Sequence, residues 1–168
     1  MPNEPQPPRV AMLRSLLLLF QPTHNHIFLC GGVGAWLFAD VVGLQVDGAG
    51  WSHFVVRPGV GSDLRTAKAE FKSVRGKVAA SWSSIEGRLG VNVTVPVTSS
   101  ADVVLPLGGA NLSTMRPSRL LEGSTVVWTE EDGFVASAVN GVSGVALSVD
   151  GLAVVASVTQ GSFSFSLA

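Results

Sequence analysis

The chain is short of charge and of cysteine, and each shortage excludes a class of function. Only 14% of its 168 residues are charged and the formal net charge is −1. The sequence therefore lacks the basic surface that non-specific binding to nucleic acid requires. The single cysteine, Cys30, has no partner for an internal disulfide. We expect no nucleic-acid partner and no disulfide framework.

Several motifs that carry chemistry are missing as well. No glycine-rich loop follows a predicted strand and opens a helix, and the nucleophile motif G-x-S-x-G does not occur. His24, His26 and Cys30 have the spacing H-x-H-x3-C, but no second pair of ligands follows at usable spacing, because His53 falls in a predicted strand. The sequence thus predicts no cofactor and no metal site.

Hydrophobic and small residues are what the chain has in quantity. Hydrophobic residues make up 46% of it and 19 residues are glycine, a composition that suits a sizeable core and short strands joined by tight turns. From Trp51 onward, apolar and polar residues alternate in about nine or ten runs. Residues 108–124 form a looser connection. Dipeptides that favour tight turns separate several runs: Glu86-Gly87, Asp132-Gly133, Asn140-Gly141 and Asp150-Gly151.

This pattern predicts an antiparallel β-sandwich. One row of inward residues is Val78, Ala80 and Trp82, and the next is Leu89, Val91, Val93 and Val95. Residues 134–139 are expected to form a further strand. Glu130, Glu131 and Asp132 fall in a predicted hairpin turn. Trp51, Trp82 and Trp128 have two interpretations, as platforms on which a sugar stacks or as core residues.

A helix precedes the strands. From Ile27 to Val42 the apolar residues have helical spacing, and Gly43 is a helix stop. The fold class is therefore mainly β, an antiparallel β-sandwich preceded by one or two α-helices. Residues 27–46 are about long enough to cross a bilayer, but Asp40 and several glycines favour a buried helix, so a membrane partner is not expected. Residues 1–22 are proline-rich and contain a short apolar run, which indicates either a signal peptide or an ill-defined leader.

An ordered series of motifs resembles the C-terminal end of the α-L-rhamnosidases, a family of glycoside hydrolases. The series begins with Asn25-His26, Gly31-Gly32-Val33-Gly34-Ala35-Trp36, and Gly50-Trp51-Ser52-His53-Phe54-Val55-Val56-Arg57-Pro58. It continues through Gly76-Lys77-Val78 and Val93-Thr94-Val95-Pro96 and ends with Gly161-Ser162-Phe163-Ser164-Phe165. The resemblance covers residues 23–168.

The resemblance implies three segments: an ill-defined leader over 1–22, the terminal helix of a missing (α/α) barrel over 23–45, and a C-terminal β-sandwich domain over 46–168. In the family the barrel carries the catalytic carboxylates, so we expect no catalytic residue in this chain. Whether the chain is an enzyme is left open. The resemblance places His26 at the rhamnose pocket as the one substrate-binding residue, and it implies a rhamnose-containing glycan as the substrate of the intact enzyme.

Without a barrel, the exposed helix would need a packing partner. Two functions remain open on the sequence: an accessory domain of a glycoside hydrolase, and a free-standing carbohydrate-binding module.

Overall fold

The structure, a computed structural model, describes residues 27–168 except 62, 109–116 and 136–138, with side chains from residue 32 onward. It divides into two compact units, Met1–Gly34 and Ala35–Ala168. The second unit holds all the strands that are described below. The predicted leader and His26 lie outside the described residues.

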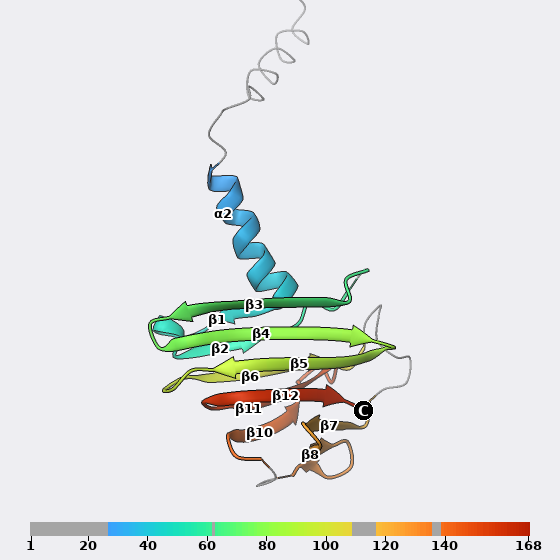
Figure 1. Cartoon of the computed structure of the whole chain (residues 1–168). Coiled ribbons are helices and arrows are strands. Elements are labelled where there is room, and N and C mark those ends of the chain that lie inside the picture. The colour runs from blue at the N-terminus through green and yellow to red at the C-terminus, as the bar shows by residue number, and fades with distance from the viewer. Residues whose placement is uncertain (1–26, 62, 109–116, 136–138) are drawn as a thin grey trace, which may run out of the picture. The chain divides into compact units, whose positions relative to one another are not determined.

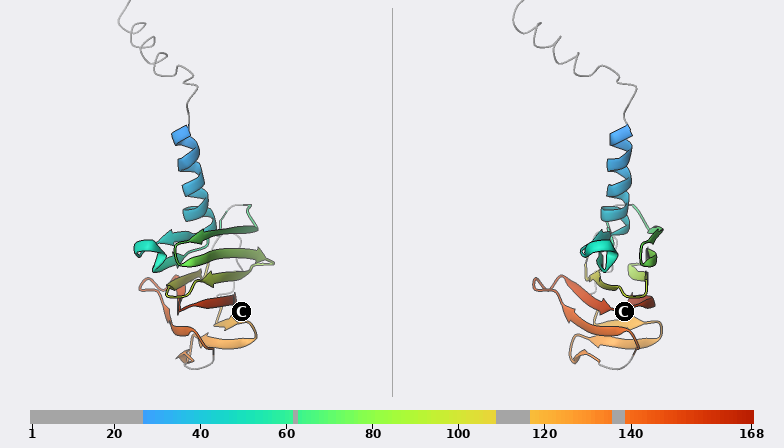
Figure 2. Two further views of the ribbon diagram at one scale, coloured as in Figure 1. Left: turned by 60° about the vertical axis from the view of Figure 1, so that its left-hand side comes forward. Right: turned by 90° about the vertical axis from the view of Figure 1, so that its left-hand side faces the viewer.

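Two sheets form the second unit (Figures 1 and 2). The five-stranded sheet has the order β1 (Leu44–Val46), β2 (His53–Val56), β6 (Ser100–Pro106), β11 (Ala153–Val158), β10 (Val142–Leu147). The seven-stranded sheet has the order β3 (Thr66–Ser73), β4 (Gly76–Ile85), β5 (Arg88–Val95), β12 (Gly161–Leu167), β7 (Arg119–Glu122), β8 (Thr125–Thr129), β9 (Gly133–Phe134). The predicted β-sandwich is confirmed.

The core lies between the two sheets and follows the predicted alternation. Every member of the two predicted inward rows, on β4 and β5, is buried. The opposite sheet contributes Phe54, Val56, Val103, Leu105, Val154 and Ala156. Each large apolar side chain that is buried in this way stabilises the fold by roughly 1.5–3 kcal/mol. Packing between the sheets, rather than any local element, therefore holds the domain together.

The predicted helix is present over the described residues and changes its geometry before it ends. α2 (Ile27–Trp36) is an α-helix, and the π-helix η1 (Leu37–Val42) continues it to Gly43. Gly43 has φ +88°, the left-handed conformation that ends a helix, and a Cβ there would overlap the carbonyl of Arg57. The predicted stop at Gly43 is confirmed. The change to a π-helix could not be read from apolar spacing alone.

Three details of the strands differ from the prediction. β2 and β6 pair in parallel, because the chain makes β3, β4 and β5 in the other sheet before it returns. β7 lies within 108–124, which was predicted to be a loose connection, and it pairs with β8 and β12. The run predicted over 134–139 contributes only the short β9, although residues 136–138 are not described.

The predicted turns are confirmed. Gly87, Gly133, Gly141 and Gly151 all have positive φ, and each follows the polar residue that the dipeptide pattern places before it. The acidic residues 130–132 occupy the turn between β8 and β9. Among the helices that the structure describes, none combines the length and the apolar character that a membrane span requires.

Candidate functional site

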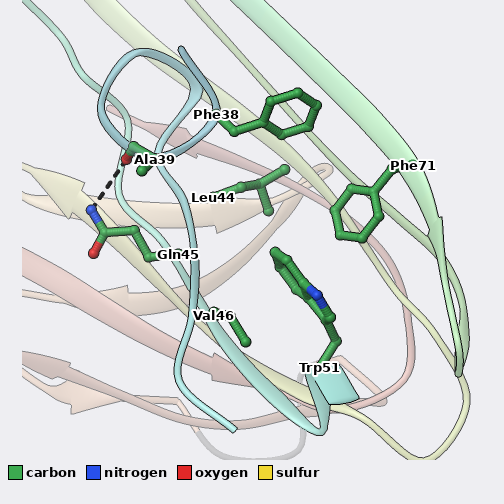
Figure 3. A pocket seen from close by; sticks show the side chains of 7 residues that line it. All are labelled: Phe38, Ala39, Leu44, Gln45, Val46, Trp51 and Phe71. Atoms are coloured by element: carbon green, nitrogen blue, oxygen red, sulfur yellow. Dashed lines mark hydrogen bonds between the residues drawn. The ribbon is translucent and has the colours of Figure 1, made fainter. Parts of the chain in front are cut away.

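An apolar groove of about 500 Å³ lies within the second unit, between η1 and the strands next to it (Figure 3). We call it the aromatic groove. Its lining residues come from η1, β1, η2 (Ala49–Trp51) and β3: Phe38, Ala39, Leu44, Gln45, Val46, Trp51 and Phe71.

Three aromatic rings that contact one another form the wall of the groove. The ring centroid of Phe71 lies 4.5 Å from that of Trp51 and 6.1 Å from that of Phe38, both in edge-to-face geometry. Trp51 also contacts Phe54 of the core at 5.8 Å. Such aromatic pairs contribute about 0.5–1.5 kcal/mol each beyond the area they bury. The groove is thus continuous with the core and has rigid walls.

Trp51 is held in a strained backbone conformation. Its φ is +64°, and Gly50 before it has φ +60°. A left-handed conformation at a bulky residue costs on the order of 1–3 kcal/mol and persists only where the surroundings fix it. Here the guanidinium Nε of Arg75 donates to the Gly50 carbonyl at 3.1 Å, and the Trp51 amide donates to the Gly48 carbonyl at 3.1 Å. These bonds direct the indole into the groove.

The edge of the groove is apolar and exposed, since Phe38 is 39% exposed and Val46 58%. Trp36 (55%) and Leu37 (45%) come directly before Phe38 in the chain and are exposed as well. We call these four residues the rim. Gln45 brings a polar side chain to the groove, and its amide already donates to the Ala39 carbonyl at 3.1 Å (Figure 3). With so few polar groups, the site suits an apolar protein surface and offers no acid or base to a reaction.

The η1 wall of the groove is fixed to the sandwich. The indole Nε1 of Trp82 donates to the Val41 carbonyl at 2.9 Å, and the Gly59 amide donates to the same carbonyl at 3.3 Å. Gly59 approaches the Asp40 carbonyl so closely that a Cβ would overlap it. The last helical turn therefore cannot shift without breaking contacts to the core.

A second group of polar residues lies on the outer side of the five-stranded sheet. His53 Nδ1 is 2.9 Å from Ser100 Oγ, and its Nε2 lies 3.5 Å from Asp102 and 3.7 Å from Asp47. Ser157 Oγ donates to Asp102 at 2.7 Å. These groups satisfy one another across β2, β6 and β11, and none of them lines the aromatic groove. We interpret the group as a polar link between strands.

The structure decides between the two interpretations, sugar platform or core residue, for two of the three tryptophans. Trp82 and Trp128 are buried in the core, so neither can stack on a sugar. Trp51 is half-buried in the aromatic groove. The structure does not test His26 as a substrate-binding residue. Among the described residues, no group of three or more His, Cys, Asp or Glu side chains is arranged to hold a metal ion.

Sequence reasoning missed the aromatic groove. The alternation of apolar and polar residues from Trp51 onward includes Phe71, but nothing in that periodicity shows that the two side chains meet. The run Trp36-Leu37-Phe38 within the predicted helix was the available signal, because three consecutive apolar residues cannot all lie on one face of a helix.

Comparison with known proteins agrees with this architecture. Residues 43–117 match the model of the bacterial α-L-rhamnosidase C-terminal domain. An α-L-rhamnosidase of Streptomyces avermitilis is 33% identical over 82 residues, which are 49% of this chain and 8% of the relative. The structure of that enzyme complexed with L-rhamnose superposes with a TM-score of 0.58 and 25% identity, over 82% of this chain and 11% of the solved one.

A second solved structure has the same fold. The α-L-rhamnosidase from Dictyoglumus thermophilum superposes with a TM-score of 0.63 at 23% identity, over 82% of this chain and 13% of that chain. The chain thus spans about a tenth of the length of these relatives: 8% of the curated relative and 11–13% of the solved chains. The matched model, the curated relative and the shared fold agree that the chain corresponds to the C-terminal region of the α-L-rhamnosidase family.

Proposed function

We propose that the chain acts as a non-catalytic accessory domain of an α-L-rhamnosidase. In this proposal residues 23–45 are the terminal helix of the catalytic (α/α) barrel and residues 46–168 are the C-terminal β-sandwich. The aromatic groove and its rim are the surface on which the barrel packs. The observation that carries the proposal is the exposure of Phe38 and Val46 at a preformed apolar groove, together with the exposed Trp36 and Leu37 just before Phe38 in the chain.

The physical argument concerns the solvent exposure of these side chains. Scattered exposed apolar residues are normal on a protein surface, whereas exposed apolar residues that line an apolar groove mark an interaction site. Burial of each side chain against a partner would contribute roughly 1.5–3 kcal/mol. The strained Trp51 and the fixed end of η1 preorganise the surface, so little ordering is needed on contact.

The catalytic chemistry belongs to the barrel in this proposal. Glycoside hydrolysis needs a pair of carboxyl groups on opposite faces of the scissile bond. His26 would line the rhamnose pocket, where its imidazole N–H donates to a sugar hydroxyl. The substrate of the assembled enzyme would be a rhamnose-containing glycan, in keeping with the relative whose structure holds L-rhamnose.

The non-catalytic part of the proposal is tested with the isolated chain. We expect no hydrolysis of p-nitrophenyl α-L-rhamnoside above the buffer rate. Turnover that persists through successive purification steps and follows the chain on a sizing column would refute it.

The packing part is tested in a chimera. Residues 35–168 of this chain replace the corresponding C-terminal region of the Streptomyces avermitilis relative. Leu37→Asp and Val46→Asp should lower the melting temperature of the chimera by several degrees and reduce its rhamnosidase activity, because each places a charge in an apolar interface. Val149→Asp is the matched control, since Val149 is fully exposed on the turn between β10 and β11, far along the chain from the rim.

If the three variants of the chimera have the same melting temperature, the rim does not pack on the barrel. The alternative of a free-standing carbohydrate-binding module has lost its main support, because Trp82 and Trp128 are buried.

A further inference from the structure

A second groove lies on the outer face of the seven-stranded sheet, where β3, β4, β5 and β12 run side by side (Figure 1). It consists of two hollows, of about 180 and 460 Å³, that share Lys77 and Thr94. We call the pair the polar groove. Its polar and charged lining residues are Lys68, Glu70, Arg75, Lys77, Ser81, Asn92, Thr94, Gln160 and Ser162.

The strand register explains the hollow. Four residues on adjacent strands form one row across the sheet: Glu70, Ala79, Thr94 and Ser162. The small side chain of Ala79 lies inside this row and leaves space above it. The row beside it runs Lys68, Ser81, Asn92. Side chains on one face of adjacent strands are neighbours, so the long lysines and the glutamate surround the short residues. The groove is thus built into the pairing of regular strands.

The groove carries more positive than negative charge. Lys77 Nζ lies 3.0 Å from Glu70, and Lys68 Nζ lies 3.7 Å from the same carboxylate. The Lys77 ammonium, by hydrogen bond and charge, and then Lys68 hold the pKa of Glu70 below its ordinary value, so Glu70 is ionised at neutral pH. Arg75 adds a further positive charge that the single carboxylate does not balance.

Arg75 is fixed in place. Its Nε donates to the Gly50 carbonyl at 3.1 Å and its Nη1 to the carbonyl and hydroxyl of Thr98, both at 3.0 Å. The part of the chain that the structure describes gives Nη2 no partner. A guanidinium that is already positioned loses little freedom when an anionic group binds to it.

The remaining lining groups are suited to sugar hydroxyls. Asn92 Nδ2 to Ser81 Oγ is 3.5 Å and Thr94 Oγ1 to Ser162 Oγ is 3.3 Å, both at the long end for hydrogen bonds. These amide and hydroxyl groups therefore keep capacity for a ligand. Pro96 and the exposed Val97 supply apolar surface beside them, as the C–H faces of a pyranose ring require.

We propose that the polar groove binds an acidic oligosaccharide, a glycan chain with a carboxylate on a pyranose ring. Arg75 and Lys77 face the carboxylate, and Asn92, Thr94 and Ser162 face the hydroxyl groups. The lysines are shared with Glu70, so the excess of positive charge is small. It suits a ligand with isolated carboxylates among many hydroxyls rather than a dense polyanion. This site shares no lining residue with the aromatic groove, although Arg75 also bonds the Gly50 carbonyl next to Trp51, and it does not depend on the proposed packing.

The test is isothermal titration of the full chain with a galacturonic acid hexamer as the acidic probe and maltohexaose as the neutral one. We expect binding of the acidic probe that weakens at least about tenfold in Lys77→Ala and in Asn92→Ala, since each removes a charge-assisted or neutral hydrogen bond worth about 1.4 kcal/mol or more. Arg88→Ala is the control: it removes one exposed positive charge from β5 outside the groove and should leave the affinity within about twofold.

A steric variant tests whether binding depends on the shape of the hollow as well as on its charge. Ala79→Gln fills the hollow without a change in charge and should also weaken binding about tenfold, while the melting temperature of each variant shows that it is folded. The proposal is overturned by absence of heat at millimolar acidic probe, by equal affinity for maltohexaose, or by a loss in Arg88→Ala as large as that in Lys77→Ala. None of these results bears on the chimera, and a failed chimera leaves this titration unaffected.

Discussion

The indole Nε1 of Trp82 donates a 2.9 Å hydrogen bond to the carbonyl oxygen of Val41, which connects β4, the neighbour of the edge strand β3, to the last turn of the helical segment. The two residues are 41 positions apart. The bond occupies a carbonyl at the end of η1, where helical partners run out, and it lets a fully buried tryptophan satisfy its only donor. A single side chain thus serves the core and the helix end together.

Removal of this donor should loosen the helix end. Trp82→Phe keeps an aromatic ring in the core but loses the hydrogen bond and some volume, so we expect a loss of about 2–4 kcal/mol in the free energy of unfolding by urea. The amides of Gly43 and Gly59 should exchange faster with deuterium, since the first donates to Phe38 of η1 and the second to the same Val41 carbonyl. Trp128→Phe, a matched loss of ring in the core, should destabilise the domain without faster exchange at these glycines.

Gly43 should tolerate no side chain. Gly43→Ala would place a Cβ against the backbone carbonyl of Arg57 at a positive φ, so we expect a loss of more than about 3 kcal/mol or failure to fold. Gly123→Ala is the control, since Gly123 has φ +58° but no atom within 4 Å of the new Cβ. It should cost only about 1–2 kcal/mol, the conformational term alone. Equal losses in urea titrations of the two variants would contradict the clash.

Replacement of Ser99 by alanine should stabilise the domain. Its hydroxyl is buried and has no hydrogen-bond partner in the described part of the chain. An unsatisfied buried group costs about 1–3 kcal/mol, so Ser99→Ala should raise the free energy of unfolding by about 1 kcal/mol. The exposed Ser164→Ala should leave it unchanged within about 0.5 kcal/mol. A loss of stability in Ser99→Ala would show that the hydroxyl has a partner after all.

The turn between β10 and β11 should respond to acid. The hydroxyl of Ser148, and then the amide of Leu152, hold the pKa of Asp150 below its ordinary value. Because the folded pKa is lowered, this contribution to stability is fully present above the unfolded pKa and is lost as the pH falls through the folded one. A carboxyl ¹³C titration should show a pKa for Asp150 below the ordinary value of an aspartate, and Ser148→Ala should raise it. An unchanged value in that variant would exclude the hydroxyl as the cause.

Much of the fold could be predicted because it depends on residues that are close in sequence. The alternation on β4 and β5 predicted their buried rows, and the polar-Gly dipeptides predicted the turns at Gly87, Gly133, Gly141 and Gly151. The helix stop at Gly43 came from the same kind of local signal.

The failures have physical causes of two kinds. β7 was missed because Leu120 and Leu121 are adjacent and its pairing with β8 shifts register between them, which removes the period-two pattern. The parallel pairing of β2 with β6 and the contact of Trp51 with Phe71 depend on segments that are distant in sequence. No local pattern encodes such meetings, and the aromatic groove depends on one of them.

The parallel alignment of β2 with β6 also constrains the order in which the domain can assemble. β2 cannot pair with β6 until the intervening strands β3, β4 and β5, which belong to the other sheet, have been synthesised. The entropy of closing so large a loop is unfavourable until those three strands have paired among themselves. During synthesis on the ribosome, the edge of β2 therefore stays unpaired until the residues of β6 have emerged.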